Sequence, residues 1–381
     1  MTALMAELNS RALELGVPLN AHLDVTYRCN ERCSHCYLDH DDHGEMTLAE
    51  IKDLLNQMAE AGVLFLTLSG GEVLMRMDFF EILSHARGLQ FCVKIKTNGF
   101  MIHDKEADRM RDLGVQEIRI SIYSHRAEVH DAITNLPGSL KRSVAAIRLL
   151  KSRGLNVVIG NVLMRQNVTD YAGVKALARD LGVEVTTDPT ITPRMDGDRS
   201  LLELGIRGPQ LHKVFRDTEL VGNVEEFCAV PDALDDSAMD NIACSAGHTY
   251  CYISPYGDVY PCVQFPLPCG NVRKDSFLDI WNNSIQLNEV RSIRARDLPT
   301  CSSCSHVGSC SRCPGLAFME GNMRGPSSLD CEKSFARTGI PSANMIAKTL
   351  PSRAGDQPDL LLHSATFASL VQITTTLMPR D

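Results

Sequence analysis

The first half of the chain repeats one pattern, in which a short apolar stretch is followed by a segment with apolar residues at helical spacing. After a predicted lead-in helix over Met5–Leu15, the strands are predicted over 21–27, 63–69, 91–97, 117–123, 156–163 and 183–189. The intervening helices are predicted over 48–61, 79–87, 104–113, 140–153 and 168–181. Strands that are apolar on both sides are typical of a parallel sheet wrapped by helices, so an α/β fold is predicted.

The number of repeated units limits the form of this sheet. Eight strand-and-helix units close a complete barrel, whereas six predict a partial (βα)6 TIM-like barrel. Thr47 and Glu50 form a capping-box pattern at the start of one of its helices, which Gly62 ends. The loops that follow the strands share one rim, where reacting groups gather in such barrels.

The pattern changes after the sixth unit, which predicts further segments. Proline and aspartate become more frequent between Arg194 and Ala243, and cysteines dominate beyond. A hairpin is predicted around Ser254–Asp258, and the partly apolar tail from Leu350 is expected to be a docked helix or disordered. The expected division is a lead-in at 1–20, the barrel at 21–195, a bridging region at 196–243, a cysteine-rich domain at 244–335 and a tail at 336–381.

Composition excludes several classes of protein. With 381 residues and 44% hydrophobic content, the chain can bury a sizeable core. Its net charge of −9 comes without a Lys/Arg-rich run, so nucleic acid is not an expected partner. A secretory signal and a membrane-spanning stretch are both absent from the sequence, so a cytoplasmic location is expected. Thiols stay reduced there, and 14 cysteines therefore indicate metal ligation.

Three cysteines follow the first predicted strand in a C-x3-C-x2-C spacing, at Cys29, Cys33 and Cys36. Thiolates bind soft metals such as iron or zinc, and three of them leave a four-coordinate site one ligand short. A three-cysteine zinc site and buried thiols remain alternatives on this spacing alone. The spacing resembles the signature of the radical S-adenosylmethionine (SAM) enzymes.

This resemblance implies a partial barrel and a [4Fe–4S] cluster whose free iron binds SAM, which is cleaved to a 5′-deoxyadenosyl radical. Gly70, Gly71 and Glu72 resemble the Gly-Gly-Glu motif of the family, although Val73 stands where many members have proline. Backbone N–H groups at the glycines and the adjacent carboxylate suit the methionyl group. Asn98 and Ser121 are predicted to reach the ribose hydroxyls, or alternatively to cap element ends.

The C-terminal cysteines suggest two four-cysteine sites, which suit zinc or iron–sulfur clusters on spacing alone. Their order resembles the SPASM extension of radical SAM peptide-modifying enzymes, which implies two auxiliary [4Fe–4S] clusters and three clusters in total. Carried over by motif, cluster I would use Cys244, Cys251, Cys262 and Cys313, and cluster II would use Cys301, Cys304, Cys310 and Cys331. The last pair is C-x2-C where the family usually has C-x3-C. Cys92, Cys228 and Cys269 are then predicted to be spare thiols.

The resemblance implies an enzyme that takes a hydrogen atom from a ribosomally made peptide or protein. The chain is similar to the radical SAM enzyme of pyrroloquinoline quinone biosynthesis, which has aspartate at the place of Cys310. The expected partners are the peptide, a separate leader-recognition protein, and an electron donor such as flavodoxin or ferredoxin. One alternative is a haem-pathway radical SAM enzyme with Arg126, Arg165 and Arg194 converging on a tetrapyrrole. The other is a zinc-stabilised adaptor without catalysis.

Overall fold

The computed structural model describes residues 3–230, 238–240, 242 and 244–349. The partly apolar tail beyond Leu350, for which a docked helix or disorder was an expectation, lies outside the described residues. No helix among the described residues is long and apolar enough to cross a membrane.

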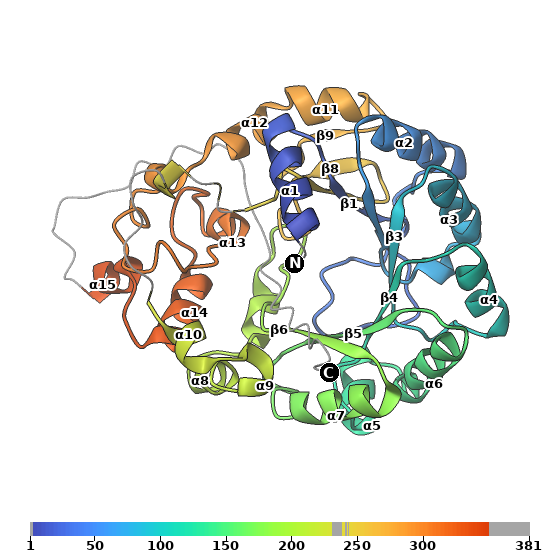
Figure 1. The fold of residues 1–381 in the computed structure, drawn as a ribbon, viewed down its shortest axis with the longest axis horizontal. Coiled ribbons are helices and arrows are strands. Elements are labelled where there is room, and N and C mark those ends of the chain that lie inside the picture. The colour runs from blue at the N-terminus through green and yellow to red at the C-terminus, as the bar shows by residue number, and fades with distance from the viewer. Residues whose placement is uncertain (1–2, 231–237, 241, 243, 350–381) are drawn as a thin grey trace.

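The six predicted strands form a parallel sheet in chain order, which confirms the predicted strand-and-helix repeat. The strands are β1 (Asn20–Asp24), β2 (Phe65–Ser69), β3 (Cys92–Thr97), β4 (Glu117–Ser121), β5 (Val157–Val162) and β6 (Glu184–Asp188). The covering helices are α2 (Leu48–Glu60), α3 (Phe79–Gly88), α4 (Asp104–Asp112), α6 (Ser139–Ser152) and α7 (Tyr171–Leu181). They lie in a ring around the outer face of the curved sheet (Figure 1). The lead-in helix α1 (Ala3–Leu15) is also present.

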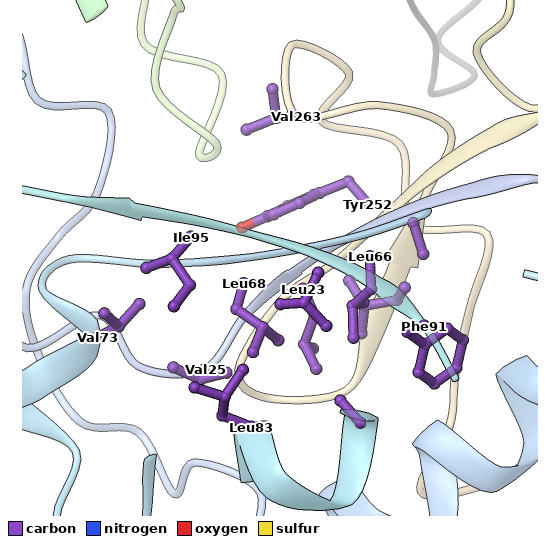
Figure 2. Packing of buried hydrophobic residues seen from close by; sticks show 14 of the residues in the cluster. Leu23, Val25, Leu66, Leu68, Val73, Leu83, Phe91, Ile95, Tyr252 and Val263 are labelled. Carbon is purple, nitrogen blue, oxygen red and sulfur yellow. The ribbon is translucent and has the colours of Figure 1, made fainter. Parts of the chain in front are cut away.

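The hydrophobic core lies between the sheet and this ring of helices. Figure 2 shows Leu23, Leu66 and Leu68 on the side of the strands that faces Leu83 of α3, with Tyr252 on the opposite side. Along β3, the buried Val93 and Ile95 alternate with the half-buried Lys94 and Lys96. The expectation that the strands are apolar on both sides is therefore wrong. Their inner face is polar because it lines a cavity rather than a second core.

The cysteine-rich region extends the barrel sheet itself. The predicted hairpin forms with β7 (Tyr250–Ile253) and β8 (Asp258–Tyr260), and Gly257 adopts φ +89° in its turn. Strand β7 pairs in parallel with β1, and β8 pairs with β9 (Gly270–Asn271), so the sheet has nine strands. Sequence periodicity did not predict this pairing, since β7 lies more than 60 residues after β6.

The remaining helices belong to the bridging and C-terminal regions. They are α8 (Pro209–Val214), α9 (Thr218–Val221), α10 (Val224–Cys228), α11 (Phe277–Asn283), α12 (Ile285–Ser292), α13 (Pro314–Met319), α14 (Ser328–Thr338) and α15 (Ala343–Thr349). Helices α8 and α10 lie against α14 (Figure 1). The Gly208 N–H donates to the Glu332 carboxylate at 2.9 Å, and Arg216 donates to the Ala336 carbonyl at 2.9 Å. These contacts hold the bridging region on the C-terminal domain.

Candidate active site

The cysteine loop that follows β1 borders a cavity of about 250 Å³ at the carboxyl ends of the strands. Cys29, Cys33 and Cys36 all line this cavity. The Cys33 thiol interacts electrostatically with the other two thiols, so the three lie close together. The structure therefore gathers at the rim the three residues that the spacing singles out.

A helix that the sequence pattern did not predict, α5 (Ala127–Thr134), supports this loop. The Arg32 and Ser34 N–H groups donate to the Thr134 and Ile133 carbonyls at 3.0 and 2.9 Å. The Asn135 side-chain amide donates to the Arg32 carbonyl at 2.5 Å. Because the middle of the loop is fixed by backbone hydrogen bonds, its thiols keep defined positions without regular secondary structure.

The three thiols fit a cationic cluster. Burial raises the pKa of Cys29 to about 12 and also raises the pKa of Cys33 and Cys36, so the polypeptide alone keeps them protonated. Iron supplies the positive charge that buried thiolates need. Among the described residues, no three His, Cys, Asp or Glu side chains converge on a single metal ion. A [4Fe–4S] cube takes its sulfur ligands at separate corners, so thiols spread around a cavity suit it.

Other polar atoms at this cavity lack protein partners. Within the described residues, the buried Glu31 Oε1 and His35 Nδ1 have no hydrogen-bond partner, and both residues line the cavity. Burial lowers the pKa of His35 to about 4, so the ring is neutral at pH 7. Buried polar atoms are rarely left unpaired in folded proteins, and their presence here indicates room for a polar ligand.

Gly70 and Gly71 line the same cavity and pack against the start of the cysteine loop. The Gly71 N–H donates to the Thr26 carbonyl at 2.8 Å. A Cβ at Gly70 would lie 2.1 Å from the same oxygen, and a Cβ at Gly71 would lie 2.4 Å from the Arg28 carbonyl oxygen. Only glycine fits this close approach of two backbones, which explains the Gly-Gly pair.

Glu72 does not line the cavity with the glycines. Its fully buried carboxylate accepts hydrogen bonds from the Thr97 hydroxyl at 2.8 Å and from the Asn98 and Leu74 N–H groups at 2.8 and 3.1 Å. Burial raises its pKa, although these hydrogen bonds oppose the shift. The carboxylate therefore joins the loops after β2 and β3, and its contact with the SAM ammonium stays a prediction.

Asn98 and Ser121, which were expected to reach a ribose, both line the cavity. The Asn98 side-chain amide donates to Asn30 Oδ1 at 2.9 Å within the cysteine loop, and the Asn98 backbone carbonyl accepts the Ser143 hydroxyl at 2.6 Å. Asn98 thus already helps to hold the loop, whereas Ser121 lies at the end of β4. Their contact with a ribose stays a prediction.

Sequence reasoning missed the polar side chains inside the barrel. His22, Lys96, Arg119 and Asp188 line the same cavity from four different strands. Burial raises the pKa of Asp188, while the Thr190 N–H, donating at 2.8 Å, opposes this shift. The alternation of charged and apolar residues within 91–97 and 117–123 was a usable signal, because period-two alternation identifies the two faces of a strand.

The four C-terminal cysteines that were predicted to hold cluster II form one group. The Cys301 thiol interacts with the Cys331 and Cys304 thiols, and the Cys310 thiol interacts with Cys331 and Cys301. The Arg312 guanidinium lies beside this group and donates to the Gly325 carbonyl at 2.8 Å. Cys331, brought in by α14, therefore completes the group although it is 18 residues beyond Cys313 in the chain.

The second predicted group is only partly assembled. The Cys313 thiol interacts with the Cys262 and Cys244 thiols, as the predicted crossing of ligands requires. Cys251 lies elsewhere, because it is on β7 with Ala21 as its cross-strand partner and interacts with Cys269. Its neighbour Tyr250 hydrogen-bonds His22 on the inner face at 3.2 Å, so the Cys251 side chain is on the outer face.

Other predicted candidates do not line the cavity. Cys92 begins β3, and the Cys228 thiol donates to the Phe215 carbonyl at 3.5 Å, so the structure does not bring either to a cysteine group. Each of the arginines considered for a tetrapyrrole has a carboxylate partner, and their convergence on a ring stays a prediction. The pairs are Arg126 with Asp170 at 2.9 Å, Arg165 with Glu203 at 3.4 Å, and Arg194 with Asp198 at 3.5 Å.

Comparison with known proteins agrees with both cysteine regions. Residues 23–187 match the Radical SAM superfamily, and residues 244–314 match SPASM, an iron–sulfur cluster-binding domain. The chain is 28% identical to an AdoMet-dependent heme synthase of Oleidesulfovibrio alaskensis, over 81% of this chain and 86% of that protein. It is 29% identical to the mycofactocin maturase MftC of Mycobacterium tuberculosis, over 81% of each chain.

The solved structure of Streptococcus suis SuiB, bound to its precursor peptide SuiA, superposes with a TM-score of 0.68. The superposition covers 86% of this chain and 80% of SuiB at 16% identity, which shows a shared fold. The matched domains, the maturase relative and the gathered thiols together show that this chain is a radical SAM enzyme with a C-terminal SPASM domain.

Proposed function

We propose that this enzyme takes a hydrogen atom from a peptide and thereby modifies a ribosomally made peptide or protein. The observation that carries the proposal is the cavity itself, because it joins three thiols and two close-packed glycines to a polar barrel interior. That arrangement offers a cluster site, a backbone surface for SAM, and adjoining space for a second molecule.

The chain's own residues have separate roles in this proposal. Cys29, Cys33 and Cys36 would hold the SAM-binding cluster, and the loop at Gly70 and Gly71 would present backbone groups to the methionyl moiety. Asn98 and Ser121 would contact the ribose. Bound SAM supplies a 5′-deoxyadenosyl radical on reduction. The surrounding barrel would exclude water and hold one C–H bond of the substrate in place.

Two comparisons support a peptide substrate. One similar protein is named as a maturase, and the SuiB structure with the same fold was determined with a precursor peptide. Two auxiliary clusters, with ligands drawn from the two C-terminal cysteine groups, would pass electrons. A flavodoxin- or ferredoxin-type donor and a separate leader-recognition protein would complete the system.

A second candidate is a radical SAM enzyme that acts on a tetrapyrrole side chain. A similar protein at 28% identity is named an AdoMet-dependent heme synthase, so sequence similarity does not separate this candidate from the first. The cationic Lys96 and Arg119 in the barrel interior also suit a carboxylate-bearing ring. The peptide is preferred because the fold neighbour was solved with one.

The test is anaerobic reconstitution of the full chain, followed by analysis of iron, sulfide and reaction products. We expect about 12 irons and about 12 sulfides per chain, corresponding to three cubes. With dithionite and SAM, 5′-deoxyadenosine should form, and mass spectrometry should detect a modified peptide among those encoded beside the gene. The Cys33→Ala variant should form neither product. A modified porphyrin with unchanged peptides would favour the second candidate, and a colourless zinc protein would favour the adaptor.

A further inference from the structure

The barrel interior contains a second cavity of about 540 Å³, on the side of the amino ends of the strands. Asn20, Phe65 and Gln116 mark that end, and Met5 of α1 also contributes to the lining. Both cavities are bordered by His22, Lys96 and Arg119. These three side chains therefore form the layer at which the space near the cysteine loop meets the space below it.

Lys96 and Arg119 are direct neighbours in this layer. They are cross-strand partners in the parallel register of β3 and β4, and both line the cavities, so their side chains lie on the same face. Gly160 on β5 leaves room for the arginine, since a Cβ there would lie 3.3 Å from Arg119 Cγ. Two like charges placed side by side inside a protein repel each other and lose hydration.

Two of the carboxylates around the pair, Glu117 and Asp24, are already engaged. Glu117 Oε2 accepts from Lys94 at 2.9 Å, and Glu117 Oε1 accepts from Arg119 at 3.0 Å. The Asp24 carboxylate is hydrogen-bonded to His22 Nε2 at 3.0 Å and accepts the Tyr252 hydroxyl at 2.9 Å.

Lys96 itself makes no hydrogen bond or ion pair with any of the described residues. Burial together with Arg119 lowers the pKa of its ammonium, and Asp24, Cys262 and Asp188 oppose this shift only as more distant charges. Lys96 is half-buried on the cavity wall, and a partly desolvated cation without a direct partner costs stability, so its position at the junction of two cavities indicates a missing anion.

We propose that Lys96, with Arg119 beside it, binds a carboxylate of the substrate at the junction of the two cavities. The ammonium and the planar guanidinium together suit one carboxylate with two oxygens. The bound carboxylate would neutralise the charges of Lys96 and Arg119, while the rest of the substrate extends toward the cysteine loop. The inference deepens the proposed function, and rests on it only for the direction in which the substrate extends.

The test measures binding without turnover, using the full reconstituted chain with SAM and without reductant. The probes are three matched pairs: a short peptide with a free or amidated C-terminus, an amidated peptide with internal glutamate or glutamine, and a propionate-bearing porphyrin or its methyl ester. In at least one pair the carboxylate form should bind about tenfold more tightly, or about 1.4 kcal/mol. The pair that shows the preference identifies the source of the carboxylate.

Two variants show whether Lys96 causes this preference. Lys96→Met should abolish it, whereas Lys94→Met should retain it, because Lys94 lies two residues away on the same strand with its charge paired to Glu117. Lys96→Met should also raise the thermal midpoint by about 2 °C or more, because it removes a partly desolvated charge that has no direct partner. Lys94→Met should not raise it.

Three results would overturn the proposal. They are the absence of a carboxylate preference in the unmodified enzyme, a fall in the thermal midpoint of Lys96→Met, and a loss of SAM affinity in that variant that matches its loss of probe affinity. The second result would make Lys96 an internal counter-ion, and the third would place it at SAM itself. Formation of 5′-deoxyadenosine, measured separately, shows whether the proposed radical function fails instead.

Discussion

The Thr97 hydroxyl donates to the buried carboxylate of Glu72 at 2.8 Å, which ties the loop after β2 to the end of β3. The same carboxylate also accepts two backbone N–H groups. A side chain that the sequence motif suggests for ligand binding therefore acts here as a structural link beneath the cavity. Its replacement should affect stability as well as SAM binding.

Substitution of Glu72 by alanine should lower the free energy of unfolding by about 2–3 kcal/mol, because it leaves the Leu74 and Asn98 N–H groups buried without acceptors. Thermal unfolding of the reconstituted enzyme would measure this loss. Thr97→Ser, which keeps a hydroxyl donor, is the matched control and should change stability little. An unchanged thermal midpoint together with lost SAM affinity would show that Glu72 contacts SAM directly.

Replacement of Cys251 and replacement of Cys262 should change the iron content of the enzyme differently. Cys262 lies with Cys244 and Cys313, whereas Cys251 lies with Cys269 on the outer face of β7. The Cys251→Ala variant should therefore keep its iron, and Cys262→Ala should lose about four irons per chain, or one cube. Metal analysis after anaerobic reconstitution distinguishes them. An equal loss of iron in both variants would show that Cys251 is a cluster ligand, as the family motif suggests.

Removal of iron should loosen the C-terminal cysteine region more than the barrel. Between Pro299 and Ser327 the structure has one short helix, α13, and the segment contains four of the cysteines. Without cluster bonds, this segment has little regular secondary structure to hold it, so it should open locally. Limited proteolysis of chelated protein should cut within 299–327 while 20–188 stays intact. Cleavage at equal rates in both regions would contradict this prediction.

His130 should make the fold sensitive to acid. Its ring is buried, Nδ1 accepts the Tyr123 N–H at 3.1 Å, and burial lowers its pKa to about 4. The unfolded chain takes up this proton near pH 6.5, so the stabilising contribution is complete above pH 6.5 and is lost as the pH falls toward 4. The full loss from one histidine is up to about 3 kcal/mol.

His130→Gln keeps an acceptor for the Tyr123 N–H but cannot titrate. The thermal midpoint of this variant should therefore fall less than that of the unmodified enzyme between pH 7.5 and pH 5. Comparing the two proteins at each pH removes the contribution of other buried histidines, such as His248, whose pKa burial also lowers to about 4. Parallel pH curves for the two proteins would show that His130 does not contribute.

The order of the six barrel strands and the five helices that cover them followed from the sequence alone, because periods of two and 3.6 residues, together with glycines and caps, are local signals. The cysteine spacing likewise singles out Cys29, Cys33 and Cys36. These features depend on residues that are neighbours in the chain. Local pattern therefore determines both the element sequence and the chemical class of the first site.

Tertiary structure decided which distant residues meet. Strand β7 joins β1 across more than 200 residues, and that pairing fixes which face carries Cys251. The Glu72 carboxylate accepts a hydrogen bond from the Asn98 N–H just after β3, and Lys96 lies beside Arg119 in the lining of a cavity. No local pattern encodes these contacts, because they depend on sheet order, register and the direction in which each strand faces.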